Sequence, residues 1–353
     1  MKILKPIQLT DSTLTSTNVH EVAPAIYVAG TTYSDGDFAH VVNGTALDIY
    51  ESLQDANTGN SPESSSTWWI YRASTYPAYA SGTTYGEGDL VLVAASHLVF
   101  ESLQAANTGK TPGTDTEWWL EVSATNTWKP FDQKVGSQIS RTGSIYYEIL
   151  PGSIEGVALF NLDATSVTIT LTDTSAGEVY NKTIALIDPS TVFDWYSYFY
   201  GEFLTSENLV VTDIPNYSNA TLEITISGGN NIDTVKCGEI AFGKVFYVGS
   251  TQYSPTIEIV DYSKKETDDF GNFVIVQRSF TKRVTLEMVA NNARINFIQN
   301  TFEENRATAV VYIPTEVEDL ADPYLTYGFF NRFSLVTRYP SHSIINVEII
   351  GLT

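Results

Sequence analysis

Cysteine and positive charge are both scarce in this chain. Cys237 is the only cysteine among 353 residues, which excludes an intrachain disulfide and leaves little basis for a thiolate metal site. Only 19 Lys and Arg stand against 41 Asp and Glu. A nucleic-acid-binding protein needs a basic surface to displace counterions from phosphates, and no basic stretch is visible, so nucleic acid is not an expected partner.

Long hydrophobic runs are also missing. No segment approaches 18 consecutive apolar residues, and residues 1–6 lack the apolar stretch of a secretory signal. We therefore expect a protein that is synthesised in the cytoplasm and is not inserted into a membrane. The net charge of −22 is best understood as a device for keeping a large surface soluble.

The residues that are plentiful favour strands. The chain has 21 Tyr, 17 Phe and 6 Trp, together with many Thr, Ser, Val and Ile. Hydrophobic residues make up 43% of the sequence, which is enough for packed cores, and the length predicts two to four domains. The expected fold class is mainly β.

An internal repeat occupies the first third of the chain. GTTYSDGD at 30–37 returns as GTTYGEGD at 82–89, and YESLQDANTGNSP at 50–62 returns as FESLQAANTGKTP at 100–112. Each copy ends in a tryptophan pair. Turn residues, two short apolar runs and a final strand around the tryptophans predict a three-stranded module of about 50 residues in each copy. A unit this small has little core, so large aromatic side chains must supply most of its burial.

The repeat resembles the small chitin-binding modules that are attached to bacterial chitinases, and similar modules occur in phage tail and fibre proteins. The matching residues are Tyr33, Gly36, Asp37, Tyr50, Pro62, Trp68 and Trp69 in the first copy, and Tyr85, Gly88, Asp89, Phe100, Pro112, Trp118 and Trp119 in the second. Members of that family usually open each module with a tryptophan, whereas Ile26-Tyr27 and Ala78-Tyr79 stand at that place here.

The resemblance implies binding of sugars by stacking on exposed aromatic rings. The candidate glycan-binding residues are Tyr33, Tyr50, Trp68, Trp69, Tyr85, Phe100, Trp118 and Trp119. Because neighbouring strand residues point to opposite faces, one tryptophan of each pair should face the core and the other the solvent. The alternative is that both tryptophans only pack the module. Glu51 and Glu101 occupy equivalent positions in the two copies. Their carboxylates are candidates for hydrogen bonds to sugar hydroxyls, and the alternative is that they only cap the strand or lie on its surface.

The rest of the chain predicts two further domains. After an N-terminal segment (1–24) and the two modules (25–74 and 75–124), alternating apolar and Thr residues predict a β-sandwich over 125–248. Residues 249–353 predict an α+β domain with several strands. Its helix is expected within Asn291–Ala307, where Ile295, Ile298 and Phe302 form one apolar face.

Three segments of this region, at 128–138, 253–272 and 347–353, resemble parts of siphophage tail or baseplate proteins. The resemblance implies a structural protein of the virion at the tail tip or baseplate, synthesised in the host cytoplasm. Its expected partners are other phage tail proteins, further copies of itself in a homo-oligomer, and host-surface polysaccharide. The alternatives are a dedicated glycan- or receptor-binding protein, or a polysaccharide-degrading enzyme with two binding modules.

Catalytic and metal motifs are not apparent. His20, His40, His97 and His342 form no metal-binding spacing, and no nucleophile elbow or phosphate loop is present. The acidic pairs Asp268-Asp269 and Glu303-Glu304 are expected to be solvated, and Asp268–Asn272 lacks the spacing of a calcium loop. Cys237 is expected to be a buried small hydrophobic residue. We therefore predict no catalytic residue, no metal and no cofactor, and a protein that is not an enzyme.

Overall fold

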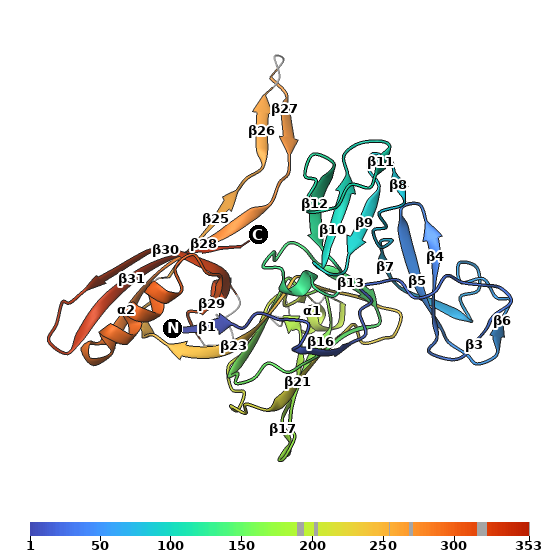
Figure 1. Ribbon diagram of the computed structural model, residues 1–353. Helices are drawn as coiled ribbons and strands as arrows, with labels where there is room; N and C mark the ends of the chain where they lie inside the picture. Colours follow the sequence, from blue (N-terminus) through green and yellow to red (C-terminus); the bar gives the residue numbers. More distant parts are fainter. Residues whose placement is uncertain (189–193, 201–203, 254, 268–270, 316–322, 353) are drawn as a thin grey trace.

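The computed structural model describes residues 1–188, 194–200, 204–253, 255–267, 271–315 and 323–352 (Figure 1). Almost all of its regular structure is antiparallel strand, which confirms the predicted mainly β class. No helix within these ranges is long and apolar enough to cross a membrane.

The largest element is a ten-stranded antiparallel sheet. Its order is β20 (Leu209–Val211), β15 (Gly156–Phe160), β23 (Glu239–Tyr247), β1 (Lys2–Pro6), β29 (Val310–Ile313), β30 (Thr326–Val336), β31 (His342–Gly351), β28 (Phe280–Asn291) and β24 (Ser250–Thr251), with β25 (Thr256–Asp261) also paired to β28. The predicted boundary at residue 248 does not divide this sheet. Strand β1 lies between β23 and β29 and so joins the regions expected to be two domains.

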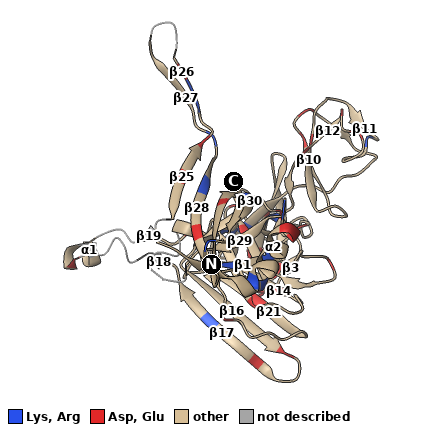
Figure 2. Cartoon of the chain, turned by 90° about the vertical axis from the view of Figure 1, so that its left-hand side faces the viewer, with Lys and Arg blue, Asp and Glu red and all other residues tan. Residues whose placement is uncertain are grey.

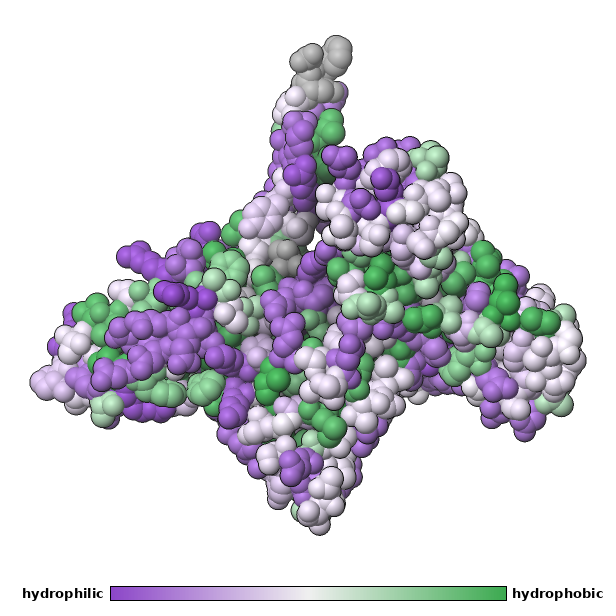
Figure 3. Space-filling view, in the orientation of Figure 1, coloured by the Kyte–Doolittle hydropathy of each residue, from purple (hydrophilic) through white to green (hydrophobic). Residues whose placement is uncertain are grey.

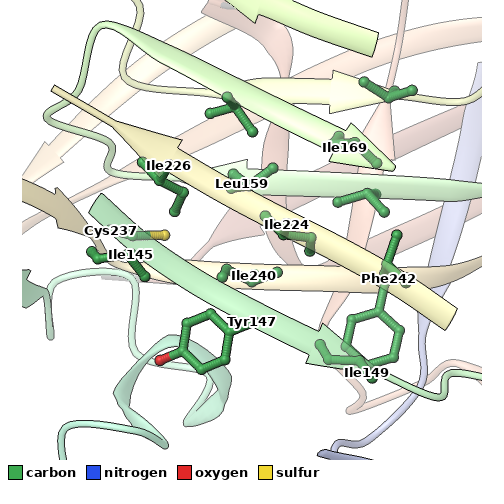
Figure 4. Packing of buried hydrophobic residues seen from close by; sticks show 14 of the residues in the cluster. Ile145, Tyr147, Ile149, Leu159, Ile169, Ile224, Ile226, Cys237, Ile240 and Phe242 are labelled. Atoms are coloured by element: carbon green, nitrogen blue, oxygen red, sulfur yellow. The ribbon is translucent and has the colours of Figure 1, made fainter. Parts of the chain in front are cut away.

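A second, five-stranded sheet packs against one part of the first. Its order is β17 (Gly177–Ala185), β16 (Ser166–Asp173), β21 (Ala220–Ser227), β14 (Ser144–Ile149) and β2 (Leu14–Thr17). Ile145, Tyr147 and Ile224 from this sheet meet Leu159 and Phe242 from the large sheet in one buried core (Figure 4). This arrangement confirms a sandwich-like architecture. Three short pieces flank it, namely β13 (Ile139–Thr142) paired with β22 (Thr234–Cys237), β18 (Ile187–Asp188) paired with β19 (Leu204–Thr205), and the 3-10 helix η1 (Lys129–Phe131).

Helix α2 (Ile295–Glu304) covers the C-terminal part of the large sheet and follows the 3-10 turn η3 (Asn292–Arg294). Ile298 and Phe302 are buried in a core with strands β28, β29 and β31, as their spacing predicted, and Ile295 is half-buried. Asn291 caps the 3-10 turn through its side-chain oxygen, which accepts the backbone N–H of Ala293 at 2.9 Å.

Two elements project from this body. Strands β26 (Lys264–Thr267) and β27 (Phe273–Val276) extend the β25–β28 hairpin away from the sheet (Figure 1). We call the described residues 256–267 and 271–283 the arm. The short helix α1 (Trp195–Tyr200) leaves the body in another direction (Figure 2).

The repeats form two separate modules beside the body (Figure 1). Module 1 contains β3 (Thr32–Tyr33), β4 (Phe38–Asn43), β5 (Ala46–Ser52), β6 (Asn57–Thr58) and β7 (Trp69–Thr75). Module 2 contains β8 (Thr84–Tyr85), β9 (Leu90–Val93), β10 (Leu98–Ser102), β11 (Asn107–Thr108) and β12 (Trp119–Ala124). Each has the expected three-stranded sheet and, in addition, a separate two-stranded pair, β3–β6 in module 1 and β8–β11 in module 2.

Candidate functional site

The two modules repeat the same internal hydrogen bonds. The buried Asn57 side chain donates to Ser52 Oγ at 2.9 Å, and Asn107 donates to Ser102 Oγ at 3.0 Å. Ala56 and Ala106, just before these asparagines, both have a positive φ, of 57° and 58°. The repeated sequence ESLQxANTG therefore specifies one strained turn and the buried amide that holds it.

The core of each module is a cluster of aromatic rings. In module 1, Tyr33 meets Trp69 edge to face at 4.9 Å between ring centroids, and Tyr27 packs against both. The Trp69 indole N–H donates to the carbonyl of Asn60 at 2.9 Å. Module 2 repeats this arrangement with the rings of Tyr79, Tyr85 and Trp119. Tyr27 and Tyr79 lie where the resembled family has its opening tryptophan.

This burial removes five of the eight predicted glycan-binding residues from consideration. Tyr33, Tyr85, Phe100, Trp69 and Trp119 are all less than one-tenth exposed, so no sugar ring can stack on them. The prediction was wrong for these residues because the modules are so small that aromatic rings are needed to form the core. The second tryptophan of each pair is the core residue, which the sequence had left open.

The first tryptophan of each pair, Trp68 or Trp118, is half-buried at the margin of its core. The two differ in their surroundings, because Lys110 Nζ lies 5.3 Å from the centroid of the Trp118 ring. The residue equivalent to Lys110 in module 1 is Asn60.

Module 1 alone carries an open aromatic surface next to polar groups. Tyr50 and Tyr71 lie opposite each other on β5 and β7, and their rings meet edge to face at 5.7 Å. Tyr71 is 41% exposed, and its hydroxyl lies 2.8 Å from Ser74 Oγ, which donates to the Asp48 carboxylate. We call Tyr50, Tyr71, Ser74 and Asp48 the tyrosine platform. Burial and the nearby Asp48 carboxylate raise the pKa of Tyr50, so its hydroxyl remains protonated at neutral pH and can donate a hydrogen bond.

Sequence reasoning included Tyr50 but missed Tyr71. Alternation would have placed Tyr71 on the same face as the core residue Trp69, but the ladder between β5 and β7 is irregular at this point and Tyr71 is exposed. Module 2 has Phe100, Glu121, Ala124 and Leu98 at the four equivalent positions, and so has no such platform.

Module 1 is fixed to the sandwich through a buried arginine. Arg72 is 4% exposed, and its Nε donates to Glu51 Oε2 at 2.7 Å. Its Nη1 donates to the carbonyls of Thr142 and Asn231, each at 3.0 Å. The Glu51 carboxylate is therefore engaged in the ion pair that attaches the module. Arg141 lies on the other side of Glu51 at 4.0 Å, and burial together with the Arg72 charge lowers the pKa of Arg141 to about 10.

Module 2 is attached differently, through His97. The two ring nitrogens of His97 lie 2.9 Å from Glu21 and 3.1 Å from Asp11, and the ring stacks on Trp128 at 4.0 Å. The same Glu21 carboxylate accepts a hydrogen bond from Thr125 at 2.7 Å. Glu21 precedes module 1 in the chain and Thr125 follows module 2, so these contacts close the ends of the repeat region against the body. The spacing of the sequence gave no indication of this role for His97.

A buried carboxyl group, Glu239, lies beneath a surface cavity of about 400 Å³ that Phe160 and Tyr327 help to line. Glu239 accepts the backbone N–H of Gln133 at 3.0 Å and a hydrogen bond from Tyr327. Burial and the nearby Asp132 carboxylate raise its pKa to about 9. The group is thus a protonated acid at neutral pH, but it is 3% exposed and does not line the cavity.

The remaining candidates for chemistry are placed as follows. Cys237 is fully buried, as expected, and burial raises the pKa of its thiol. Glu303 and Glu304 are exposed on α2, whereas Asp268 and Asp269 lie outside the described residues. Within the described ranges, no three His, Cys, Asp or Glu side chains are grouped so that they could hold a metal ion.

Comparisons with protein-family models, curated proteins and solved structures give no match for this chain.

Proposed function

We propose that this chain is a structural protein of a phage tail, at the tail tip or baseplate, and that it holds module 1 outward to contact host-surface polysaccharide. The proposal begins from the sequence resemblances of the repeat and of the C-terminal segments. It assigns an architectural role to residues 125–353 and a binding role to the tyrosine platform.

One structural observation carries the proposal, namely that the two modules have kept the same core but not the same surface. The ring cluster and the Asn–Ser turn are repeated, while the tyrosine platform occurs in module 1 only. A module used purely as a spacer needs the core but has no need for Tyr50 and Tyr71 above it. Aromatic rings beside a carboxylate and a hydroxyl are groups that can bind a sugar, because the rings stack on its apolar face and the oxygens accept hydrogen bonds from its hydroxyl groups.

The rigid attachment of module 1 also supports this proposal. The Arg72–Glu51 pair and the two carbonyl contacts fix the module relative to the sandwich. A binding surface whose orientation is fixed loses less entropy when it engages a polymer. One tyrosine stack is worth only about a kcal/mol, so a single module would bind weakly. Several copies in one tail would raise the avidity by orders of magnitude.

Binding is tested with purified full-length protein on host-surface polysaccharide and on insoluble chitin. We expect Tyr71→Ala to weaken retention by about tenfold, the equivalent of about 1.4 kcal/mol. The matched control is Glu121→Ala at the equivalent position of module 2, which should bind as the unchanged protein does. Equal retention by Tyr71→Ala and the unchanged protein would reduce module 1 to a spacer.

The place in the virion is tested separately by cryo-electron microscopy of the phage whose genome encodes this chain. We expect density for the sandwich within the tail tip or baseplate, with the modules at the periphery. Purified virions that contain no copy of the chain would refute the structural role, whatever the binding result.

A further inference from the structure

The arm exposes an unusual amount of hydrophobic surface. Strand β27 has the sequence FVIV, and all four of its side chains are exposed, from 75% for Phe273 to 49% for Val276. Ile259, Tyr262 and Phe280 lower on the arm are also more than half exposed. The paired strand β26, with the sequence KKET, is entirely polar. Figure 3 shows hydrophilic residues over much of the visible arm and a hydrophobic patch beside them.

Such a hairpin is not expected to be stable in water by itself. Alternation places Phe273 and Ile275 on one face of β27 and Val274 and Val276 on the other, so no single contact within the arm buries both pairs. A two-stranded hairpin without a covered face is marginal, and an exposed hydrophobic edge strand is a site for pairing with another chain. The arm therefore has the properties of a surface that is buried in an assembly.

We propose that the arm packs against a second copy of this chain, with β27 as the central contact. This inference rests on the proposed structural function and identifies the segment that makes the contact between subunits. The seven exposed hydrophobic side chains present on the order of 700 Å², close to the roughly 800 Å² that each partner contributes to a stable interface.

The charge distribution favours a second copy as the partner. Residues 256–283, the whole length of the arm, contain five of the 19 basic residues and five of the 41 acidic ones, so the arm carries no net charge. The remainder of the chain holds fourteen basic and 36 acidic residues. Two chains that each carry −22 repel one another, and the neutral arm is a segment that can pack against the acidic body of a neighbouring copy without adding to this repulsion.

A second exposed apolar element suggests how copies could continue to add. Helix α1 exposes Trp195, Tyr196, Phe199 and Tyr200, each by 65% or more, and it leaves the body in a different direction from the arm (Figure 2). Head-to-tail assembly requires two different contact surfaces on each subunit, which generate a ring when the rotation closes. The chain has two such surfaces.

The test compares two sets of substitutions in the cross-strand residue pairs of β26 and β27 whose side chains lie on the same face of the arm. Phe273 pairs with Thr267 and Ile275 pairs with Lys265, so the double variant Phe273→Ser/Ile275→Ser removes the hydrophobic column. Thr267→Ser/Lys265→Ser alters the polar column of the same residue pairs and is the matched control. Masses are measured by light scattering and sedimentation across about 1–100 µM, a range that spans ordinary interface affinities.

We expect the unchanged protein and the control to form one defined oligomer, and the hydrophobic double variant to shift to the 38.9 kDa monomer. Circular dichroism and the melting temperature verify that the variant remains folded. A photo-crosslinker at position 275 should join two copies of the chain. A monomeric unchanged protein, or an oligomer that survives the double substitution, would overturn the inference. Neither outcome affects the virion and polysaccharide tests, so the arm contact and the proposed function can be refuted independently of each other.

Discussion

Glu239 should give the sandwich a measurable dependence of stability on pH. Its carboxyl is 3% exposed, and burial together with Asp132 raises its pKa to about 9, compared with about 4.3 in an unfolded chain. At neutral pH the folded protein therefore holds a proton that the unfolded chain has released. Because the folded pKa is the higher one, the stabilising contribution is complete below pH 4 and is lost as the pH rises towards 9.

The magnitude follows from this difference of one bound proton. Where the folded state is protonated and the unfolded state is ionised, the free energy of unfolding falls by about 1.4 kcal/mol per pH unit. Asp132, whose pKa burial also raises, contributes with the same sign. Burial lowers the pKa of His20, which contributes with the opposite sign, but only as the pH falls below about 6.5. The interval from pH 7 to 8.5 is therefore the informative one.

The perturbation is Glu239→Gln, which removes the titrating proton but retains an oxygen that can accept the Gln133 N–H. The assay is urea unfolding followed by far-ultraviolet circular dichroism at several pH values. Over that interval we expect the variant to lose about 2 kcal/mol less stability than the unchanged protein. Glu178→Gln, at an exposed position on β17, serves as the control and should leave the pH dependence as it is. Parallel curves for Glu239→Gln and the unchanged protein would refute the reasoning.

Three further substitutions test how the modules are built and attached. Arg72→Ala should cost about 3–5 kcal/mol because it removes the buried guanidinium from the junction, which leaves the Thr142 and Asn231 carbonyls without this donor and Glu51 with only the more distant Arg141. Limited proteolysis should then release module 1, whereas Val122→Ala at the equivalent exposed position of module 2 should have little effect. Gly143→Ala should destabilise the same junction, since its φ is +99° and an added Cβ would lie 2.6 Å from Arg72 Nη1; a melting temperature equal to that of the unchanged protein would contradict this. Trp69→Phe should lower the free energy of unfolding of module 1 by about 1–3 kcal/mol, because the Asn60 carbonyl loses the indole N–H that it accepts. An unchanged melting temperature would show that this hydrogen bond does not stabilise the module.

Local patterns in the sequence predicted the local structure well. Alternation predicted strand β16, where Val167 and Ile169 are buried, and the spacing of Ile298 and Phe302 predicted the buried face of α2. The repeat was visible because the small modules depend on specific turns and rings, so few of these residues could differ between the copies. The sequence could not assign the aromatic rings to core or surface, because a module of this size uses the same residue types for both purposes.

Long-range contacts were beyond such reasoning. Nothing near β1 in the sequence indicates that it pairs with β23 and β29, so one continuous sheet was predicted as two domains. The attachment of module 1 depends on Arg72, and the only hint was that its equivalent in module 2 is a valine. Positions at which the two repeats differ therefore include the docking contact and the tyrosine platform, whereas positions at which they agree form the cores of the modules.

The position of β1 also has a kinetic consequence. Lys2 pairs with Tyr247 on one side and with Ile313 on the other, so β1 is synthesised long before either of its neighbouring strands. The modules depend on nearby residues and can fold while synthesis continues. Closure of the large sheet requires the two distant halves of the chain to meet around β1. A truncated product that ends before β29 would carry folded modules on an open sheet with an unpaired edge at β1, which is a starting point for aggregation.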